Sequence, residues 1–455
     1  MTEKKPDDPK RVDARPTKAL FIHMLTRDIQ LIPAIIDLVD NSGDGARRLR
    51  PDGDYSDLRV TLTFDGGKFE IQDRCGGIAP DVAREYAFRF GRQPDFPALK
   101  HSVGQFGVGM KRALFKLGRS FRIESSHKKG RFTLEVDVVK WERNENDWDF
   151  RFDEVEDKPQ PKSNWGTKIT VNALSDDVAA KFALESFEDD LVREIASRLR
   201  VPIERGLAVL VNGQSVQHPV LEFVSGDFAP SYEKRRYDDL DADDGQRKPP
   251  VTLRIWCGLA RDKGPDRAGW YVYCNGRLVL EAEKTDKTGW GYDVEDLAAP
   301  AFHQQYNYFR GVAMFDCDDP GRLPWNTMKT DVVPESPIYR DARQQMVRHM
   351  RPVISCLNRL KEERAAEKDV GKGGLTKKLE DAVTATLGAV HRRREFSTPT
   401  VKPKTKRGPP LQIISTYEKP KDQAEAVRAK LRATSWRDVG SRTFDYYHKR
   451  ECEGD

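Results

Sequence analysis

Three polar side chains recur at helical spacing near the N-terminus. Asp37, Asn41 and Asp44 follow the pattern i, i+4, i+7, so on a helix they share one face. Carboxylate and amide groups on such a face can hold a metal ion and a water molecule. An ordinary solvated helix face has the same pattern, so the spacing alone leaves both interpretations open.

A glycine pair follows in the segment DRCGGI at 73–78. Asp73 ends an alternating strand pattern, and Gly76 and Gly77 would let a ligand approach the backbone closely. A tight turn without a ligand is the alternative. The segment becomes informative only together with its neighbours.

A third segment, GQFGVGMK at 104–111, places three glycines and a lysine where a helix begins. Backbone N–H groups of glycines can surround phosphate oxygens, and a helix N-terminus favours negative charge. Lys111 could add an ion pair. The order G-x-x-G-x-G differs from the GxxxxGK[ST] pattern of P-loop proteins, which disfavours that class.

The first two segments resemble motifs of the GHKL ATPase superfamily. That superfamily includes histidine kinases, DNA gyrase B subunits, ninety-kilodalton heat-shock chaperones, MutL-type repair proteins and MORC proteins. Its first motif is a Glu followed four residues later by Asn and then Asp, and Asp37, Asn41 and Asp44 stand at those positions. Its DxGxG motif is similar to Asp73 and Gly77, with a cysteine in place of the middle glycine.

The resemblance extends along the chain. GQFGVG is similar to the superfamily's glycine-rich lid, and the following Met-Lys is MORC-like. Gly166-Thr167 matches the late Gly-Thr motif. The segment 326–343 resembles the transducer loop that returns a lysine, here Lys329, to the γ-phosphate; an unrelated surface lysine is the alternative.

The resemblance implies a slow ATP hydrolase that uses ATP and Mg²⁺. Asp37 would activate the attacking water, although it is one methylene shorter than the Glu of the family. Asn41 would hold the metal, and Lys329 would stabilise charge at the γ-phosphate. The implied nucleotide-binding residues are Asn41, Asp44, Asp73, Gly77, Ile78, Gly104, Gln105, Phe106, Gly107, Val108, Gly109, Lys111 and Thr167.

Helical and alternating patterns together predict an α+β protein. The resemblance implies that the chain begins with a Bergerat-type α/β sandwich ATPase domain. A transducer-type α/β domain and a helical C-terminal region would follow it. A helix is expected from Leu31 to Ala46, and a hairpin from strands 58–64 and 68–73 around Asp65-Gly66-Gly67. The expected boundaries are a disordered 1–16, an ATP-binding domain 17–180, a transducer-type domain 181–336, a helical region 337–396, and a basic linker and tail 397–455.

Some element boundaries are expected within these regions. The segment 131–141 is expected to be one strand, and the segment 207–216 a strand of the second domain. The helix that begins near 337 is expected to break at Lys372-Gly373-Gly374, with a second helix running to about 394.

Composition excludes several classes. No apolar run approaches the ~20 residues of a membrane span, and the N-terminus lacks the apolar stretch of a secretory signal. The six cysteines are scattered, which disfavours a disulfide framework or a structural zinc site. We therefore expect a soluble cytoplasmic protein without a membrane partner.

Charge is distributed unevenly. Residues 336–455 hold 27 Lys and Arg against 16 Asp and Glu, a balance of +11, whereas the whole chain carries +5. Such a basic end suggests DNA as a partner, although a solvated helical surface is the alternative.

Among the relatives, the sequence is most similar to prokaryotic MORC-like proteins. None of the eight histidines precedes Glu or Asp, which disfavours a sensor kinase. The resemblance implies an ATP-gated homodimerising switch or clamp on DNA, in anti-phage or restriction-linked defence. A catalytically weak nucleotide-sensing adaptor, or a chaperone-like protein acting on a protein partner, is the alternative.

Overall fold

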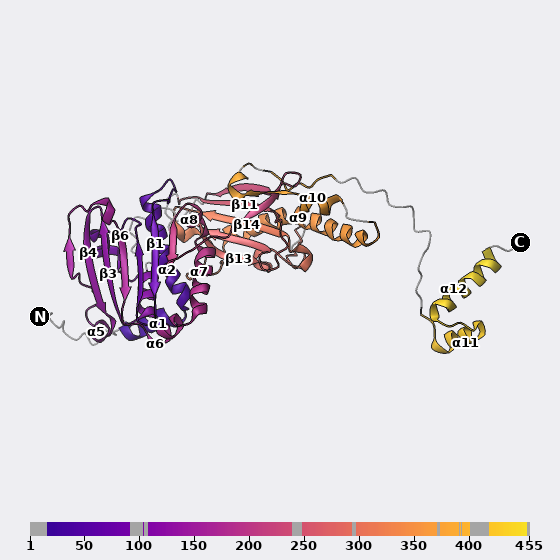
Figure 1. Cartoon of the computed structure of the whole chain (residues 1–455), viewed down its shortest axis with the longest axis horizontal. Coiled ribbons are helices and arrows are strands. Elements are labelled where there is room, and N and C mark those ends of the chain that lie inside the picture. Colours follow the sequence, from indigo (N-terminus) through magenta and orange to yellow (C-terminus); the bar gives the residue numbers. More distant parts are fainter. Residues whose placement is uncertain are drawn as a thin grey trace, which may run out of the picture. The chain divides into compact units, whose positions relative to one another are not determined.

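The computed structural model describes residues 16–91, 103, 108–238, 248–293, 297–370, 374–390, 392, 394–400 and 418–452. Two compact units divide the chain, Met1–Pro399 and Thr400–Asp455, and each is described by itself (Figure 1).

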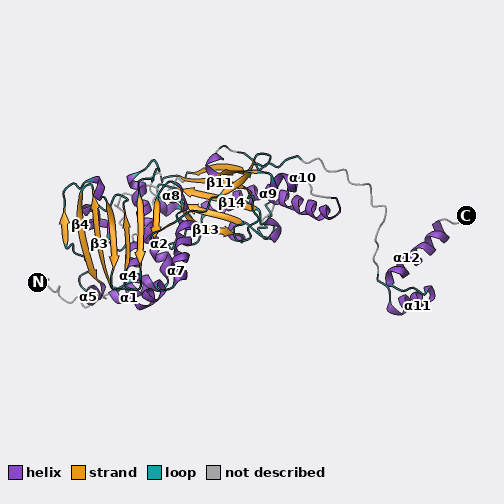
Figure 2. Cartoon of the chain, viewed as in Figure 1, coloured by secondary structure: helices purple, strands orange, loops and turns teal. Residues whose placement is uncertain are grey.

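A mixed sheet of eight described strands lies in the first half of the first unit, in the order β5-β4-β3-β6-β2-β1-β7-β8 (Figure 2). Its strands are β1 (Arg59–Phe64), β2 (Phe69–Asp73), β3 (Ser120–His127), β4 (Gly130–Asp137), β5 (Glu154–Glu156), β6 (Gly166–Val171), β7 (Ala208–Val211) and β8 (Gln214–Ser215). Burial alternates along β3 and β4, so one face of the sheet is covered and the other is open.

Helices cover that buried face. The helices of this part of the chain are α1 (Lys18–Arg27), α2 (Leu31–Leu49), α3 (Pro80–Val82), α4 (Gly109–Leu117), α5 (Val138–Arg143), α6 (Asp176–Phe182), α7 (Glu185–Arg198) and α8 (Arg200–Glu204). Side chains of α2, α4 and α7 form a continuous core with the strands. The mixed α/β architecture expected from the sequence is present, and the large sheet is consistent with a GHKL ATPase fold.

The expected hairpin is confirmed. β1 and β2 pair antiparallel, with Val60 opposite Asp73. Oδ1 of Asp65 accepts hydrogen bonds from the backbone N–H groups of Gly67 (2.7 Å) and Lys68 (3.0 Å), which closes the turn through a side chain.

Two expected assignments are wrong at this level. The strand at 207–216 does not belong to the second sheet: β7 pairs parallel with β1, with Arg59 opposite Ala208. The first sheet therefore continues past the expected boundary at 180. The segment 131–141 is not one strand, because Asp137 Oδ1 accepts from the backbone N–H of Lys140 and starts α5 there.

Gly77 is required by a close approach between backbone segments. Its φ is +68°, and a Cβ at this position would lie 2.0 Å from the backbone oxygen of Ser126. We expect Gly77→Ala to lower the free energy of unfolding by at least about 2 kcal/mol, because neither backbone segment can give way. Urea unfolding followed by circular dichroism measures this.

The matched control is Gly43→Ala, within α2, where a Cβ would meet no atom within 4 Å. It should stabilise the protein by about 0.5–1 kcal/mol, because alanine loses less entropy than glycine in a helix. Equal midpoints for Gly77→Ala and wild type would show that the turn relaxes.

A second sheet follows, in the order β10-β11-β14-β12-β13. Its strands are β10 (Ser231–Tyr237), β11 (Val251–Leu259), β12 (Gly269–Cys274), β13 (Arg277–Glu283) and β14 (Phe309–Asp316). The long helix α9 (Pro337–Val370) packs on this sheet through Tyr339, Ala342, Met346 and Met350, all fully buried.

The helix α9 ends at Val370 and α10 (Gly374–Glu380) follows, so the expected break at 372–374 falls mostly on residues 371–373, which lie outside the described residues. The expected helix to about 394 is wrong. The chain instead forms β15 (Val383–Thr386), which pairs antiparallel with β9 (Glu222–Ser225). Three β-branched residues in VTAT, one valine and two threonines, favour a strand there.

The second unit contains α11 (Lys421–Leu431) and α12 (Trp436–Tyr447), which pack on each other. Only Ala433 and Val439 are buried among its described residues. In the described parts of the chain, no single helix has the length and apolar composition of a membrane span; the bent pair α1–α2 meets that test by length and composition only.

Candidate functional site

Helix α2 carries the site, and both apolar and acidic side chains of this helix are buried in the protein. Leu31, Ile35 and Leu38 are buried in the core. The acidic side chains of Asp37, Asp40 and Asp44 are buried as well, whereas Asn41 is exposed. Buried carboxylates require cations or hydrogen-bond donors, so their partners identify the function of this helix.

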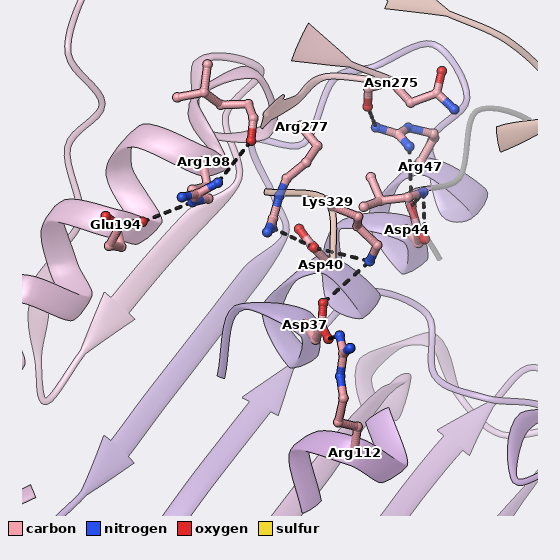
Figure 3. A network of polar contacts seen from close by, with 12 residues as sticks. Asp37, Asp40, Asp44, Arg47, Arg112, Glu194, Arg198, Asn275, Arg277 and Lys329 are labelled. Atoms are coloured by element: carbon pink, nitrogen blue, oxygen red, sulfur yellow. Dashed lines mark hydrogen bonds and ion pairs between the residues drawn. The ribbon is translucent and has the colours of Figure 1, made fainter. Parts of the chain in front are cut away.

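Asp37 lies between two cations from distant segments (Figure 3). Nη2 of Arg112, on α4, donates to Oδ2 of Asp37 at 2.5 Å. Nζ of Lys329 lies 3.5 Å from Oδ1. Burial opposes ionisation, but Lys329 and Arg112 outweigh it and hold the pKa of Asp37 below its ordinary value.

Asp40, one residue before Asn41, has a cation of its own. Nη1 of Arg277, at the start of β13, donates to Oδ2 of Asp40 at 2.6 Å, and Nζ of Lys329 lies 3.7 Å from the same oxygen. Burial raises the pKa of Asp40 although both cations act in the other direction.

Lys329 occupies a turn that presents it to α2. The turn lies between Trp325 and Val332, which form an isolated bridge, and the backbone N–H of Lys329 donates to the oxygen of Asn326 at 3.0 Å. The φ of Lys329 is +55°. A positive φ is unusual for a residue other than glycine. It is consistent with a backbone that the surrounding structure holds in this conformation so that the lysine side chain is directed toward α2.

Asp44 performs a different task from its neighbours. Both of its oxygens accept the backbone N–H of Val103, at 2.9 and 3.0 Å, and Arg47 lies 3.3 Å from Oδ1. Nη2 of Arg47 also donates to the backbone oxygen of Asn275 at 2.8 Å. Asp44 therefore anchors the backbone at 103, and its contact with nucleotide stays a prediction.

Asp73 and Thr167 lie next to each other, and their contact with a nucleotide stays a prediction. Oδ1 of Asp73 accepts from the backbone N–H groups of Cys75 (2.8 Å) and Thr167 (3.3 Å), and the Ser42 hydroxyl donates to Oδ2 at 3.1 Å. Burial raises the pKa of Asp73 against these hydrogen bonds. Ser125 extends the network.

Ser125 connects the network to the glycine turn. Its Oγ accepts the backbone N–H of Ile78 at 2.8 Å and lies 3.0 Å from Oγ1 of Thr167. The turn at 76–78 is thus joined to β3 and β6. Asp73 and Thr167 also line a hollow of about 640 Å³ between charged strand residues and Trp165.

The expected ion pair of Lys111 with phosphate is not supported. Lys111 is 1% exposed, and its Nζ donates to the backbone oxygens of Ala87 (3.1 Å) and Arg89 (2.5 Å). The helical phase of α4 turns Lys111 into the core while the next residue, Arg112, reaches Asp37. The predicted role of Lys111 as a partner of phosphate is therefore not supported.

Burial lowers the pKa of Lys111 to about 7. An unfolded lysine titrates near 10.4, so between these values the unfolded chain binds more protons and stability rises with pH. We expect the free energy of unfolding of wild type, relative to Lys111→Met, to rise by up to about 1.4 kcal/mol per pH unit from pH 7 to 10. Urea titrations at pH 7, 8 and 9 measure it; parallel profiles would contradict the burial of a titrating amine.

The lid glycines Gly104 and Gly107, with Gln105 and Phe106, lie outside the described residues. Val108 precedes α4, and Gly109 begins it. A Cβ on Gly109 would lie 3.2 Å from Oδ2 of Asp37, so the first turn of α4 lies against this carboxylate.

Several residues of the site carried too little local signal to be predicted. Arg112 and Asp40 lie beside predicted motif residues, so their neighbours could have drawn attention to them. Arg277 lies in an ordinary turn sequence, CNGR, and Ser42 and Ser125 are common serines. Only their contacts identify them.

The comparisons with known proteins agree with this geometry. Residues 29–162 match the family model described as histidine kinase-, DNA gyrase B-, and HSP90-like ATPase. This part of the chain is thus similar to GHKL-type ATPase domains, and the similarity supports ATP binding. The matched range includes Asp37, Asn41 and Asp73, whereas Thr167, Arg277 and Lys329 lie beyond it. A comparison with curated proteins gave no match.

Proposed function

We propose that this chain is a Mg²⁺-dependent ATPase. The region of the first sheet would bind the nucleotide, and a lysine from the region of the second sheet would contact its terminal phosphate. The observation that carries the proposal is the approach of Lys329 to Asp37 and Asp40, across 292 residues of sequence for the first pair. Such a cation beside the nucleotide-binding helix suits the terminal phosphate of ATP.

The adenine end belongs to the network of Asp73 and Thr167. A buried carboxylate held by Ser42 can accept a hydrogen bond from an exocyclic amino group. The start of α4 at Gly109, together with the glycines before it, would bind phosphates through backbone N–H groups.

Asn41 would hold the magnesium ion. Its amide is exposed on α2, one turn after Asp37, and an amide oxygen is a hard ligand of the kind that Mg²⁺ accepts. The remaining ligands of such an ion usually come from phosphates and water. Among the described residues, no group of three or more His, Cys, Asp and Glu side chains could hold a metal.

Asp37 would orient the attacking water and accept its proton. Its ion pairs with Arg112 and Lys329 favour the ionised form and make it a weak base. Water must also compete with Arg112 for the carboxylate. Both features agree with slow hydrolysis.

We propose further that the chain acts as MORC-like ATPases do. ATP would drive its dimerisation, and the basic C-terminal part would hold DNA, in a defence role. Exposed basic side chains on the second unit support DNA binding: Lys430, Arg432, Arg437, Lys449 and Arg450. Exposed aromatic side chains on the same unit favour the second candidate, an adaptor for a protein partner: Trp436, Phe444, Tyr446 and Tyr447.

Three measurements test these proposals. Calorimetric titration with a nonhydrolysable ATP analogue and Mg²⁺ should show binding, and light scattering should show dimers with the analogue but not with ADP. DNA binding should weaken steeply with salt, because phosphate contacts release counterions. Absence of DNA binding at low salt would favour the adaptor.

A further inference from the structure

Two carboxylates and three cations meet on α2, and they are unequally paired (Figure 3). Arg112 contacts Asp37 at 2.5 Å, and Arg277 contacts Asp40 at 2.6 Å. Lys329 lies farther away, at 3.5 and 3.7 Å from the same two carboxylates. Each carboxylate therefore has its own arginine, and Lys329 is the surplus cation of this group.

The neighbouring carboxylates pair with arginines of their own and do not balance the positive charge of Lys329. Asp44 lies 3.3 Å from Arg47, and Glu194 lies 2.9 Å from Arg198, so each of these carboxylates also has an arginine. An anionic ligand would complete the charge balance at Lys329.

Arg277 is the cation that keeps Asp40 from requiring Lys329. The side chains of Arg277 and Asp40 are 3% and 4% exposed, so neither charge can be left without a partner. Of the described cations within 4 Å of Asp40, removal of Arg277 would leave Lys329.

The backbone beside Arg277 is held in place. It follows a turn in which Asn275 and Gly276 have φ of +47° and +79°. The Asn275 side chain donates to the backbone oxygen of Cys317 at 3.0 Å and accepts its N–H at 2.9 Å. Arg47 donates to the Asn275 oxygen, which joins this turn to α2.

We propose that Arg277 is a positioning residue for Lys329: by serving as the counter-ion of Asp40, it leaves the Lys329 ammonium available to the terminal phosphate of a nucleoside triphosphate. The inference rests on the proposed function, and it deepens it by naming how the site distinguishes a triphosphate from a diphosphate. Arg277 acts through Asp40 and does not touch the nucleotide.

The test compares the affinities of the full-length chain for a nonhydrolysable ATP analogue and for ADP, each with Mg²⁺, by calorimetry. Wild type should prefer the analogue. Arg277→Gln should lose about tenfold of that preference, because Lys329 becomes the counter-ion of Asp40, while ADP affinity stays near wild type. Arg277→Lys keeps the charge and should keep the preference.

The decisive variant is Arg277→Gln combined with Asp40→Asn. With the carboxylate charge also removed, Lys329 is free again, and the preference for the analogue should return. A merely structural role for Arg277 would lower the affinity for ADP as well as for the analogue, whereas the inference predicts that only the preference between them changes. This double variant removes both charges of the buried Arg277–Asp40 pair, so it remains informative where Arg277→Gln alone is unstable.

The outcomes separate the two proposals. A wild-type protein that binds neither nucleotide overturns the proposed function and this inference with it. A wild type that prefers the analogue, while Arg277→Gln prefers it equally, overturns the inference alone. So does a double variant that folds and does not regain the preference.

Discussion

Asn41→Ala should abolish the binding of Mg²⁺-ATP, with a loss of roughly 100-fold or more in affinity, equal to about 2.7 kcal/mol. Asn41 supplies the side chain that we assign to the metal, and its amide is exposed on α2 rather than engaged in the core. Removing it should therefore affect the ligand far more than the fold. Calorimetric titration with the ATP analogue and Mg²⁺ measures the affinity.

The control is Asn146→Ala, which removes an exposed asparagine from the loop after α5. It should bind nucleotide as wild type does. Circular dichroism should show both variants folded. Unchanged affinity in Asn41→Ala would mean that the metal is held elsewhere, and the assignment of the site on α2 would fail.

Asp37→Asn should reduce ATP turnover by roughly 10²- to 10⁴-fold, the usual range for losing a positioned general base. Binding of the analogue should remain, because the substitution removes one negative charge beside Lys329 and leaves that cation less neutralised. Asparagine retains the shape of the side chain and an oxygen that can accept from Arg112. Steady-state phosphate release at saturating ATP measures turnover.

Asp57→Asn is the matched control, because Asp57 is exposed and forms its ion pair with Arg50 at the surface. Turnover in this variant should equal that of wild type. Equal hydrolysis in Asp37→Asn and wild type would assign Asp37 a structural role in holding Arg112 and Lys329. The proposal of a carboxylate base would then be wrong.

Local patterns predicted much of the first region correctly. The helix expected at 31–46 is α2, and its stripe of Leu31, Ile35 and Leu38 is buried. The hairpin around Asp65 is present because its turn is closed by contacts within three residues. Such features depend on neighbouring residues, so periodicity and turn chemistry are sufficient to predict them.

Sequence patterns gave wrong predictions where the structure of a segment depends on the element that packs against it. The strand at 207–216 was correctly a strand, but alternation does not name a neighbour, and β7 joined the first sheet through β1. Lys111 was correctly placed at the start of a helix. The direction in which α4 packs then buried its amine against the oxygens of Ala87 and Arg89.

The apolar periodicity of the sequence was sufficient to predict helix α2, and on a helix the separation of four residues places Asp37 and Asn41 on one face. The sequence also indicated the resemblance to GHKL ATPases, since motifs are local, and the family match at residues 29–162 supports it. Only the tertiary structure decided which charges meet. Arg277 and Asp40 are 237 residues apart, and Lys329 and Asp37 are 292 residues apart. No sequence spacing encodes such contacts, because they form only when the two sheet regions pack around one helix and bury charges that then require partners.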